Sequence, residues 1–437
     1  MEVRDPVHGS IQIEDSEIPI LEHLFFQRLR GIKQLGFSDH AFPGATHTRY
    51  LHSIGVMHVG TLAFNKIFPY PHNGETKRLK ETLRLSCLLH DIGHAPLSHS
   101  TETVMPCLQK LNLPARFLDA KDLFQERQAT HEDFTIKAIV DSSFGKSFSQ
   151  VEKKFGVSRE SIAELIIGKT SDPTYFTIGG VNYFPLMHQL CSSELDCDRM
   201  DYLLRDSYFC GVSYGKFDLD WIIDNLSACE IDGTAYLGIS ERAVSTFDDF
   251  LLSRFHMFLM VYFHYRAVCL EKMLHHLFQI SPDEYRIPAD IEEYQKHDDH
   301  FLASRLKRSN HPLAKKIVNN SIPSKIFETF GPRYLNKLKN LEQFLKSEEI
   351  EYFRCSSKGR LSKYYGDTMI PPKIEDPYSL KVAPVNRTAN KEKFLNINEA
   401  TDLFGRYSDA HEVNRIHVEF ELLSSSQQKE INHLIES

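Results

Sequence analysis

The chain has 437 residues, of which 41% are hydrophobic and 25% charged, so it is long enough for one large globular domain or two ordinary ones. Its formal net charge of −8 disfavours non-specific binding to nucleic acid, which depends on neutralising many phosphates with Lys and Arg. The eight cysteines form no CxxC pair and the N-terminus is charged from its second residue, which predicts reduced thiols, no secretory signal and a cytoplasmic protein.

Most of the first 290 residues are expected to be helical. The stretch LEHLFFQRLRGIKQLG, residues 21–36, places apolar side chains close to the 3.6-residue period of a helix. Residues 248–280 are long enough for one central, largely buried helix, but the arginines and histidines within them make this stretch too polar to cross a membrane. Further helices are expected over residues 48–68, 77–94, 133–141, 159–168 and 194–208.

Strands are expected at a few places only. The stretch ACEIDGTAYLGI, residues 228–239, sets Asp-Gly between two apolar runs, which predicts a β-hairpin. After a charged helical stretch over 331–353, residues 368–385 and 414–423 are typical of extended segments. We therefore predict a mainly α fold, with a helical catalytic core over residues 1–290 and a smaller α+β lobe over residues 291–437 that serves oligomerisation or regulation.

Imidazole and carboxylate groups are concentrated in LLHDIGHAPLSHS, residues 88–100. His90 and Asp91 are adjacent there, and both side-chain types are good ligands for a divalent first-row metal. His52 on an earlier helix and Asp198 on a later one complete a set of two imidazoles and two carboxylates. Taken singly, His52 is more typical of a core histidine and Asp198 of a helix-surface carboxylate. Together they indicate a metal site with coordination positions left open for water and substrate.

His99 and Glu102 form a candidate proton-donor pair. They lie three residues apart and would share one face of a helix. A carboxylate beside an imidazole fixes its tautomer and favours its protonated form, which suits general acid catalysis near neutral pH.

Several blocks in order carry a family resemblance. They are RDPVHGSIQI with FFQRLRGIKQLG, FPGATHTRYLHSIGV, HDIGHAPLSH, and SSELDCDRMDYLLRDSYFCGVSYGKFD. Together they resemble the HD-domain deoxynucleoside triphosphate (dNTP) triphosphohydrolases, with gaps, from residue 3 to residue 280. The HD pair alone marks a broad superfamily of phosphohydrolases, whereas the ordered blocks are more typical of this branch. The C-terminal lobe is compatible in character but adds no sharp motif.

The resemblance implies an HD-type fold for residues 1–290 and metal ligation by His52, His90, Asp91 and Asp198. It also implies hydrolysis at the α-phosphorus of a dNTP, which releases a deoxynucleoside and inorganic triphosphate. Mixed nitrogen and oxygen ligands admit Mn, Fe, Ni, Zn or Mg, so the donor types do not choose between these metals.

By the same resemblance, His99 and Glu102 match the family's donor pair, and His94 lines the pocket near the phosphate. His131, followed by an acid, matches a further family pair near the active site. The alternative for His131 is the solvated start of a helix, because Thr130 is a typical N-cap.

The family pattern also assigns substrate contacts. It implies that arginines contact the triphosphate and that an aromatic wall, a carboxylate and a glutamine hold the sugar. At residue 199 this chain has arginine where the family often has lysine, which changes the hydrogen-bond geometry. For several of these side chains an ordinary core role is the alternative. The assigned residues are Arg49, Arg199 and Arg254 for phosphate, and Gln34, Tyr202, Asp206 and Tyr262 for the sugar side.

Some members of the family are activated by a nucleotide bound between subunits, which implies a homodimer or homotetramer. The positions that read the activating guanine correspond to Glu22, Gln27 and Arg30, on the helix expected over residues 21–35. The family has aspartate where this chain has Glu22, which puts guanine recognition in question. The alternative is a polar stripe on an amphipathic helix.

Two other functions remain open from the sequence. An HD-type nuclease or phosphodiesterase would use the same metal chemistry on single-stranded or other nucleotides, although the acidic net charge offers no obvious strand-binding surface. A catalytically inert nucleotide-sensing module is the other alternative, and the complete set of expected metal ligands argues against it.

Overall fold

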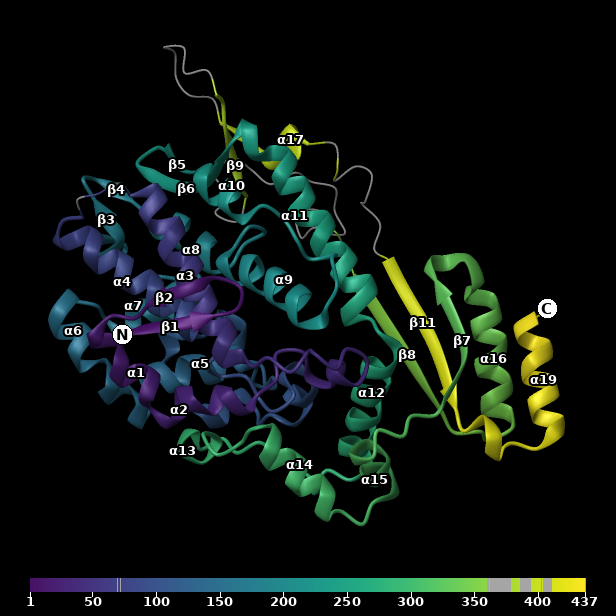
Figure 1. Ribbon diagram of the computed structural model, residues 1–437. Helices are drawn as coiled ribbons and strands as arrows, with labels where there is room; N and C mark the ends of the chain where they lie inside the picture. Colours follow the sequence, from purple (N-terminus) through teal and green to yellow (C-terminus); the bar gives the residue numbers. More distant parts are fainter. Residues whose placement is uncertain are drawn as a thin grey trace.

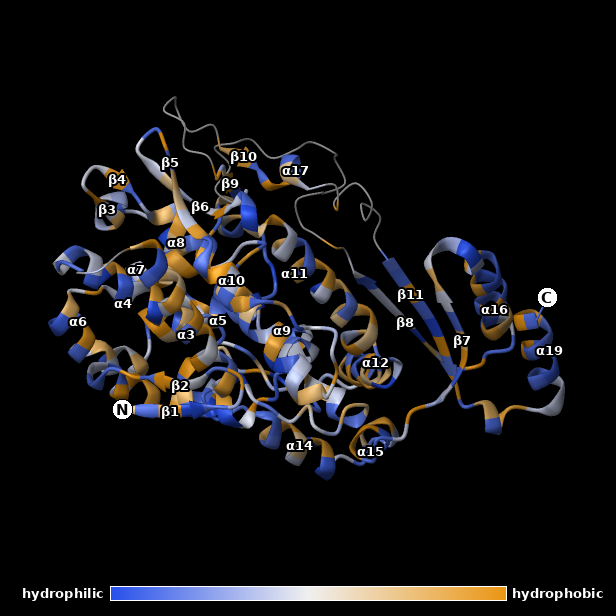
Figure 2. Cartoon of the chain, turned by 45° about the horizontal axis from the view of Figure 1, so that its top comes forward, coloured by the Kyte–Doolittle hydropathy of each residue, from blue (hydrophilic) through white to orange (hydrophobic). Residues whose placement is uncertain are grey.

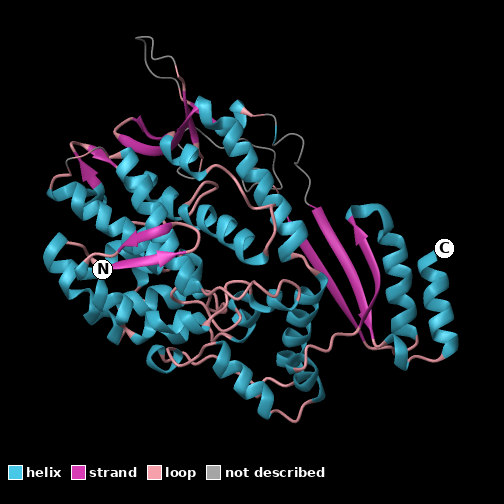
Figure 3. Ribbon diagram, viewed as in Figure 1, coloured by secondary structure: helices cyan, strands magenta, loops and turns pink. Residues whose placement is uncertain are grey.

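The computed structural model describes residues 1–68, 70, 72–359, 361, 379–385, 394–401, 403 and 411–436. Helices dominate a larger body, and within the described residues the strands form sheets of two, six and three strands (Figure 1, Figure 3). The mainly α fold with a smaller α+β part is therefore confirmed.

Helix α3 (Arg49–Ile67) packs against α4 (Gly74–Leu89) and α9 (Cys197–Cys210) in the middle of the larger body (Figure 1). Side-chain caps start two of these helices: Asn73 accepts a hydrogen bond from the N–H of Thr76, and Asp196 from that of Arg199. The expected helices over residues 48–68, 77–94 and 194–208 are thus present, with α4 ending earlier than expected. Around them lie α5 (His131–Val140), α6 (Ser149–Phe155), α7 (Arg159–Ile167), α8 (Phe184–Cys191) and α10 (Leu219–Asp224).

The helix expected over residues 21–36 is interrupted. A hairpin of β1 (Glu2–Asp5) and β2 (Gly9–Gln12) precedes two short helices, α1 (Ile18–Glu22) and α2 (Leu24–Gln27). His23 separates them because its backbone is extended and its side chain caps the second helix by accepting from the N–H of Phe25. A 3₁₀ turn over residues 28–31 then ends the helical stretch.

The long helix expected over residues 248–280 is also wrong. The chain forms α11 (Val244–Met257), a π-helical turn (Phe258–Tyr262) and α12 (Tyr265–Ile280). His264 is extended and its ring caps α12, so it begins a new helix where the apolar pattern runs on without a break. The apolar period does not reveal this break, because each of the two helices has buried apolar residues at helical spacing.

A mixed sheet of six strands lies at one edge of the larger body. Its strands run in the order β10-β9-β6-β4-β3, and β5 pairs with β6 as the expected hairpin. Asp232 and Gly233 both have positive φ in that turn, which is the signature of a tight two-residue hairpin. The strands are β3 (Thr177–Ile178), β4 (Val181–Asn182), β5 (Leu226–Ile231), β6 (Thr234–Ser240), β9 (Lys381–Ala383) and β10 (Leu395–Asn396).

Residues after 290 contribute to two regions. Strands β9 and β10 extend the sheet of the larger body, whereas a separate antiparallel sheet in the order β7-β11-β8 stands on the far side of α12 (Figure 1). Most of the extended segment expected over residues 368–385 lies outside the described residues, and the boundary near residue 290 stays a prediction. The remaining elements are α13 (Ile291–Tyr294), α14 (Asp299–Arg308), α15 (Pro312–Val318), β7 (Ser324–Phe330), α16 (Leu335–Ser347), β8 (Tyr352–Gly359), α17 (Ile397–Ala400), β11 (His411–Val418) and α19 (Ser425–Glu436).

Hydrophobic residues, orange in Figure 2, are concentrated where the helices of the larger body meet. A second, smaller core lies between the β7-β11-β8 sheet and helices α16 and α19. It includes Ile416 and Val418 on β11 and Leu341 on α16, all of them buried. The C-terminal sheet therefore has one face on its own core and the other face toward α12.

Candidate active site

Three side chains from separate helices meet at the centre of the larger body. His52 comes from α3, His90 from the end of α4 and Asp198 from the first turn of α9, and one donor atom from each lies within 4.8 Å of the others. The distance from His52 Nε2 to Asp198 Oδ1 is 2.9 Å, and that from His90 Nε2 to the same oxygen is 3.6 Å.

Asp91 joins this cluster from the turn after α4. Its Oδ1 lies 3.4 Å from His90 Nε2 and its Oδ2 lies 3.6 Å from His52 Nε2. All four side chains that the sequence predicted as metal ligands are therefore together. Arg49, one turn before His52 on α3, pairs with the Asp91 carboxylate and donates through Nε to Ser98 Oγ at 2.8 Å.

Hydrogen bonds at Nδ1 orient both imidazole rings so that their Nε2 atoms face the cluster. His52 Nδ1 lies 2.7 Å from Asp201 Oδ2, and His90 Nδ1 lies 2.8 Å from the carbonyl oxygen of Cys87. In each case this leaves Nε2 buried without hydrogen-bond geometry to any described residue. Metal-binding histidines are usually oriented in this way by a carboxylate or carbonyl on the other nitrogen.

Asp201 was missed by the sequence analysis. It lies three residues after Asp198 on α9, so the helical spacing was the available signal. Its other oxygen lies 2.7 Å from His8 Nε2, and Arg205 donates to the same carboxylate at 2.8 Å. The N-terminal hairpin thus supports the carboxylate that orients His52.

The electrostatics of the cluster indicate that it holds excess negative charge. Burial alone would lower the pKa of His52, but the adjacent carboxylates of Asp198 and Asp201 raise it to about 9. Burial acts in the same direction on His90, and the Asp91 and Asp198 carboxylates raise its pKa to about 10. The histidines, with Arg49 at Asp91, hold the pKa values of both carboxyls below their usual range despite burial. Protons on His52 and His90 therefore supply the positive charge that a bound cation would otherwise supply.

The donor set fits a six-coordinate divalent ion. Adjacent ligands bonded to one ion at about 2.1 Å stand about 3.0 Å apart. The measured separations between donor atoms of 2.9, 3.4 and 3.6 Å approach this spacing. Two orphaned buried Nε2 atoms and two carboxylates therefore match a metal site in both geometry and chemistry.

A second group of titratable side chains borders the first. His99 Nδ1 lies 3.2 Å from Glu102 Oε1, within the 3₁₀ helix Ser98–Val104, and His131 Nδ1 lies 2.5 Å from the same oxygen. Burial would raise the pKa of Glu102, but hydrogen bonds from His131 and His99 lower it below its usual range. The Glu102 carboxylate therefore stays charged at neutral pH and is shared by two imidazoles.

His94 stacks on the His131 ring with centroids 3.9 Å apart and an interplanar angle of 14°. Burial, with Arg49 and His131 nearby, holds the pKa of His94 well below its usual range, so its imidazole is neutral. A neutral imidazole does not donate as an imidazolium. The acid among these histidines is therefore His99 or His131.

Close packing fixes this second group. A Cβ at Gly93 would lie 2.1 Å from the carbonyl oxygen of His131, so only glycine lets the turn after α4 approach the start of α5. Leu97 and Ser98 both have positive φ, and the N–H of Leu97 donates to Asp299 Oδ1 at 2.6 Å. The sequence analysis did not identify Asp299 as a support, because it lies about 200 positions further along the chain.

Members of both groups line one cavity of about 420 Å³: His90, Asp91 and Asp198 of the first, and His94, His99 and His131 of the second. Most of the predicted substrate residues lie on its wall. Arg254 does not: its guanidinium is 2.7 Å from Glu194 and donates to the carbonyl oxygen of Leu361 at 2.6 Å, which turns it away from the cavity. The predicted substrate residues on the wall are Gln34, Arg49, Arg199, Tyr202, Asp206 and Tyr262.

One end of the cavity carries a carboxylate with fixed donors. Tyr262 donates its hydroxyl to Asp206 Oδ2 at 2.8 Å, and His47 Nε2 lies 2.8 Å from Asp206 Oδ1. The Tyr202 ring meets that of Tyr262 edge to face. Nearby, Gln34 Oε1 is buried without a hydrogen-bond partner among the described residues. This part of the cavity combines two aromatic rings with the Asp206 carboxylate and one unsatisfied polar atom, Gln34 Oε1, a combination that suits a sugar.

The residues predicted to bind an activating nucleotide lie around the broken helix. Arg30 donates through Nε to Gln27 Oε1 at 2.7 Å and stacks on the Tyr50 ring at 3.5 Å. Glu22 is exposed at the end of α1, on a separate element from Gln27. The prediction that all three residues lie on one helix is therefore wrong, although Gln27 and Arg30 are paired.

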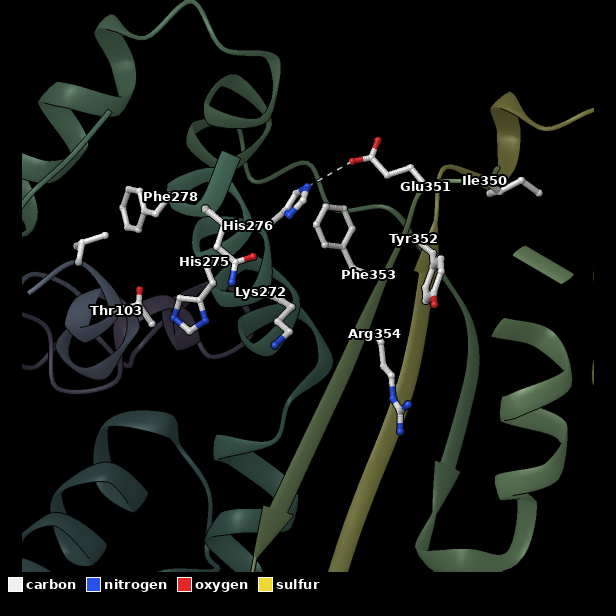
Figure 4. Close-up of a pocket in the computed structure, with 12 residues that line it drawn as sticks. Thr103, Lys272, His275, His276, Phe278, Ile350, Glu351, Tyr352, Phe353 and Arg354 are labelled. Carbon is white, nitrogen blue, oxygen red and sulfur yellow. Dashed lines mark ion pairs between the residues drawn. The ribbon is translucent and has the colours of Figure 1, made fainter. Parts of the chain in front are cut away.

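A larger cavity of about 730 Å³ lies elsewhere, between α12 and the start of β8 (Figure 4). Lys272, His275 and His276 face it from α12, and Phe353 and Arg354 from β8. It holds none of the clustered histidine and aspartate donors, so size alone does not locate the candidate site.

Comparisons with known proteins agree with this arrangement. A family model described as the HD domain matches residues 49–206, which contain all four predicted metal ligands. An uncharacterized protein of Mycoplasma genitalium is 33% identical over 371 residues, covering 79% of each chain. A crystal structure of a hypothetical protein from Aquifex aeolicus superposes with a TM-score of 0.72 at 25% identity over 99% of each chain.

The human deoxynucleoside triphosphate triphosphohydrolase SAMHD1 is 25% identical over 356 residues. The match covers 75% of this chain but 54% of the human protein, so the chain spans about half the length of that relative. None of the described helices is both long and apolar enough to cross a membrane.

Proposed function

Because the chain belongs to the HD-domain, dNTP triphosphohydrolase-like family of phosphohydrolases, we propose that it hydrolyses dNTPs to deoxynucleosides and inorganic triphosphate. One observation carries the proposal: a donor cluster that fits a divalent ion, an imidazole–carboxylate group, and the Asp206, Tyr202 and Gln34 side chains meet at one cavity. The function needs these three parts together.

His52, His90, Asp91 and Asp198 would hold the ion, with Asp201 and the Cys87 carbonyl orienting the two imidazoles. A divalent ion at such a site lowers the pKa of a water molecule and neutralises negative charge on the attacked phosphate. The mixed nitrogen and oxygen donors admit Mn, Fe, Ni, Zn or Mg, and elemental analysis of the purified protein would identify the ion.

Proton delivery falls to the second group. A water oxygen bonds to the α-phosphorus, the bond from that phosphorus to O5′ breaks, and O5′ takes a proton. We assign this proton to His99, because both histidines line the cavity but the His99 side chain is 61% exposed, whereas that of His131 is 19% exposed and stacked on His94. Glu102, 3.2 Å from His99 Nδ1, would orient the ring as the proton donor.

The remaining wall would bind substrate. Arg49 and Arg199 border the donor cluster, where phosphate oxygens would lie, and Arg199 also faces Glu194 and Asp196 at 3.4 and 3.7 Å. Asp206 would accept the 3′-hydroxyl, with Gln34 nearby, while Tyr202 would pack under C2′. Arg254 would act indirectly by neutralising Glu194 beside Arg199.

Activation and assembly are further parts of the proposal. A nucleotide between subunits would contact Gln27 and Arg30, which already form a pair at the surface, and Glu22 would lie on the neighbouring helix. This requires a homodimer or homotetramer. The panel that tests it supplies dNTPs singly and in pairs, since synergy in pairs reveals an activating site.

The experiment that tests the function is product analysis. Purified protein is incubated with Mn²⁺ and each dNTP, and the products are separated. Deoxynucleoside with triphosphate supports the proposal, whereas pyrophosphate or orthophosphate would contradict it. Cleavage of a labelled single strand instead would point to a nuclease, and nucleotide binding without turnover under any metal would indicate a sensor.

A further inference from the structure

Another set of side chains that could hold a metal ion lies outside the candidate active site. Cys269 on α12, Cys355 on β8 and His417 on β11 have no exposed surface, and one donor atom from each lies within 4.8 Å of the others. The set joins the larger body to the C-terminal sheet, because α12 belongs to the first and both strands to the second.

Strand register brings two of the donors together. In the antiparallel pair of β8 and β11, Cys355 is opposite Arg415 and Phe353 is opposite His417. Cys355 and His417 are therefore diagonal neighbours on one face of the sheet. The alternate residues Ile416 and Val418 point to the other face, into the small core beneath α16 and α19. The donor face is the one that α12 covers, which brings Cys269 onto it.

The His417 ring is oriented as metal-binding imidazoles usually are. Its Nδ1 lies 3.1 Å from the carbonyl oxygen of Pro323, which accepts the ring N–H. The lone pair is then on Nε2, and this atom is buried with no hydrogen-bond partner among the described residues. An orphaned buried acceptor is costly, so a missing partner is expected there. A metal ion held by His417 Nε2 and the two cysteine sulfurs would be such a partner.

The donor chemistry selects one class of ion. Thiolate sulfur and imidazole nitrogen bind Zn²⁺ strongly and bind Mg²⁺ or Ca²⁺ poorly. Two thiolates and a neutral imidazole also cancel the charge of a divalent ion, so the complex can be buried at modest cost. The cluster in the catalytic cavity has no sulfur among its donors, which separates the two sites chemically.

We propose that Cys269, Cys355 and His417 bind one zinc ion that fastens the C-terminal sheet to α12. Three protein donors leave the fourth position of a tetrahedral ion to a water molecule. The ion would cross-link α12 to the C-terminal sheet, whose strand β8 packs Phe353 and Cys355 into the main core, and would raise the stability of their docking. Residues Lys272 and Arg354, near the donors on the same two elements, line the cavity in Figure 4. The proposal does not depend on the proposed catalytic function.

Cobalt substitution tests the site on the intact wild-type protein. Co²⁺ bound by thiolate gives an intense charge-transfer absorption in the near ultraviolet, and Co²⁺ bound only by imidazole and carboxylate does not. The protein is stripped with a chelator, reloaded with Co²⁺ and scanned. We expect the thiolate band to saturate at one ion per chain. Absence of the band in folded wild-type protein would overturn the proposal without reference to any variant.

Variants assign the donors. Cys269→Ser, Cys355→Ser and His417→Ala should each remove or shift the thiolate band and reduce bound zinc, measured by elemental analysis, by about one ion per chain. Cys229→Ser, which changes another buried thiol, is the matched control and should keep both. Unchanged zinc content in the first three variants would contradict the assignment.

Thermal unfolding, together with mass spectrometry, distinguishes a zinc site from a redox-active pair of thiols. Zinc should raise the melting temperature of wild type and of Cys229→Ser, and it should do so less in Cys355→Ser. If mass spectrometry of the untreated protein finds Cys269 and Cys355 joined by a disulfide that zinc does not prevent, the two thiols are a redox pair and the proposal fails.

Discussion

His131 lies closer to Glu102 than His99 does: its Nδ1 is 2.5 Å from the carboxylate oxygen that His99 approaches at 3.2 Å. The sequence favoured His99 as the proton donor because it alone had an acid at helical spacing. The structure shows that this acid is shared across the cavity. Spacing therefore no longer distinguishes the two histidines, and exposure to the cavity becomes the criterion.

We predict that His99→Ala lowers kcat by about 10²–10⁴-fold, the usual value of a general acid, and leaves metal binding unchanged. The reason is that His99 is the more exposed member of the pair and, in the proposed mechanism, donates the proton to O5′. Steady-state kinetics and a metal titration on the same preparation check both parts.

His131→Ala is the matched control for this assignment. It removes the stacked partner of His94 and should lower kcat less, because Glu102 still orients His99. A larger loss in His131→Ala than in His99→Ala would transfer the donor role to His131. Glu102→Gln should resemble His99→Ala and shift the acidic or basic limb of the pH–rate profile, which a purely structural role would not do.

Metal binding should release protons and strengthen as the pH rises. In the metal-free protein the pKa of His52 is raised to about 9 and that of His90 to about 10, so both are charged at pH 7.5 and must lose their protons to bind a metal. We expect release of close to two protons per ion, measured by calorimetry in buffers of different ionisation enthalpy. His52→Gln should release about one fewer. Release that does not depend on pH between 6.5 and 9 would contradict the ligand assignment.

The same shifts predict the stability of the metal-free protein. Because the folded pKa values of His52 and His90 exceed the unfolded value near 6.5, their contribution is complete below that pH. It is lost as the pH rises toward 9 and 10. The melting temperature of the metal-free protein should fall across this window, while the increment given by Mn²⁺ should grow.

Tyr202 should set the preference for deoxyribose over ribose. Tyr202→Ala removes the wall under C2′ and should raise kcat/KM for GTP relative to dGTP by about 10–200-fold, the range of a steric discrimination. Tyr202→Phe keeps the ring and should preserve the wild-type ratio. If the alanine variant discriminates as wild type does, the ribose hydroxyl is excluded elsewhere.

Asp299 should position the catalytic turn from outside the predicted catalytic domain. It accepts from the N–H of Leu97 at 2.6 Å and from that of Lys33 at 2.9 Å, so it fixes the strained turn before His99. We expect Asp299→Ala to lower kcat by about 10–100-fold, since small misplacements of catalytic groups are costly. Asp283→Ala, an exposed acid in the same region, should behave as wild type, and equal kinetics in both variants would remove this role from Asp299.

Local chemistry explains what the sequence predicted well. The adjacent polar residues His90 and Asp91 are unusual at the end of a buried helix and so indicate a site. The Asp-Gly pair at residues 232–233 favours a tight turn, and the hairpin is present. Both signals depend on neighbouring residues alone, so no knowledge of the fold was needed to read them.

Long-range packing explains what the sequence missed. The breaks at His23 and His264 follow no change in apolar period, because each histidine caps the next helix while the buried face continues. The ion pair between Arg254 and Glu194 joins α11 to the connection between α8 and α9, which only the fold brings together. The Cys269 cluster is invisible for the same reason, since its donors lie on elements far apart in the chain.

The central claim is that water attacks the α-phosphorus at the donor cluster, and isotope labelling tests it most directly. The reaction is run to completion in ¹⁸O-labelled water with Mn²⁺ and one dNTP, and both products are analysed by mass spectrometry. The account predicts one labelled oxygen in the triphosphate and none in the deoxynucleoside, and no turnover above background in Asp198→Ala. Label in the deoxynucleoside, or pyrophosphate in place of triphosphate, would contradict it.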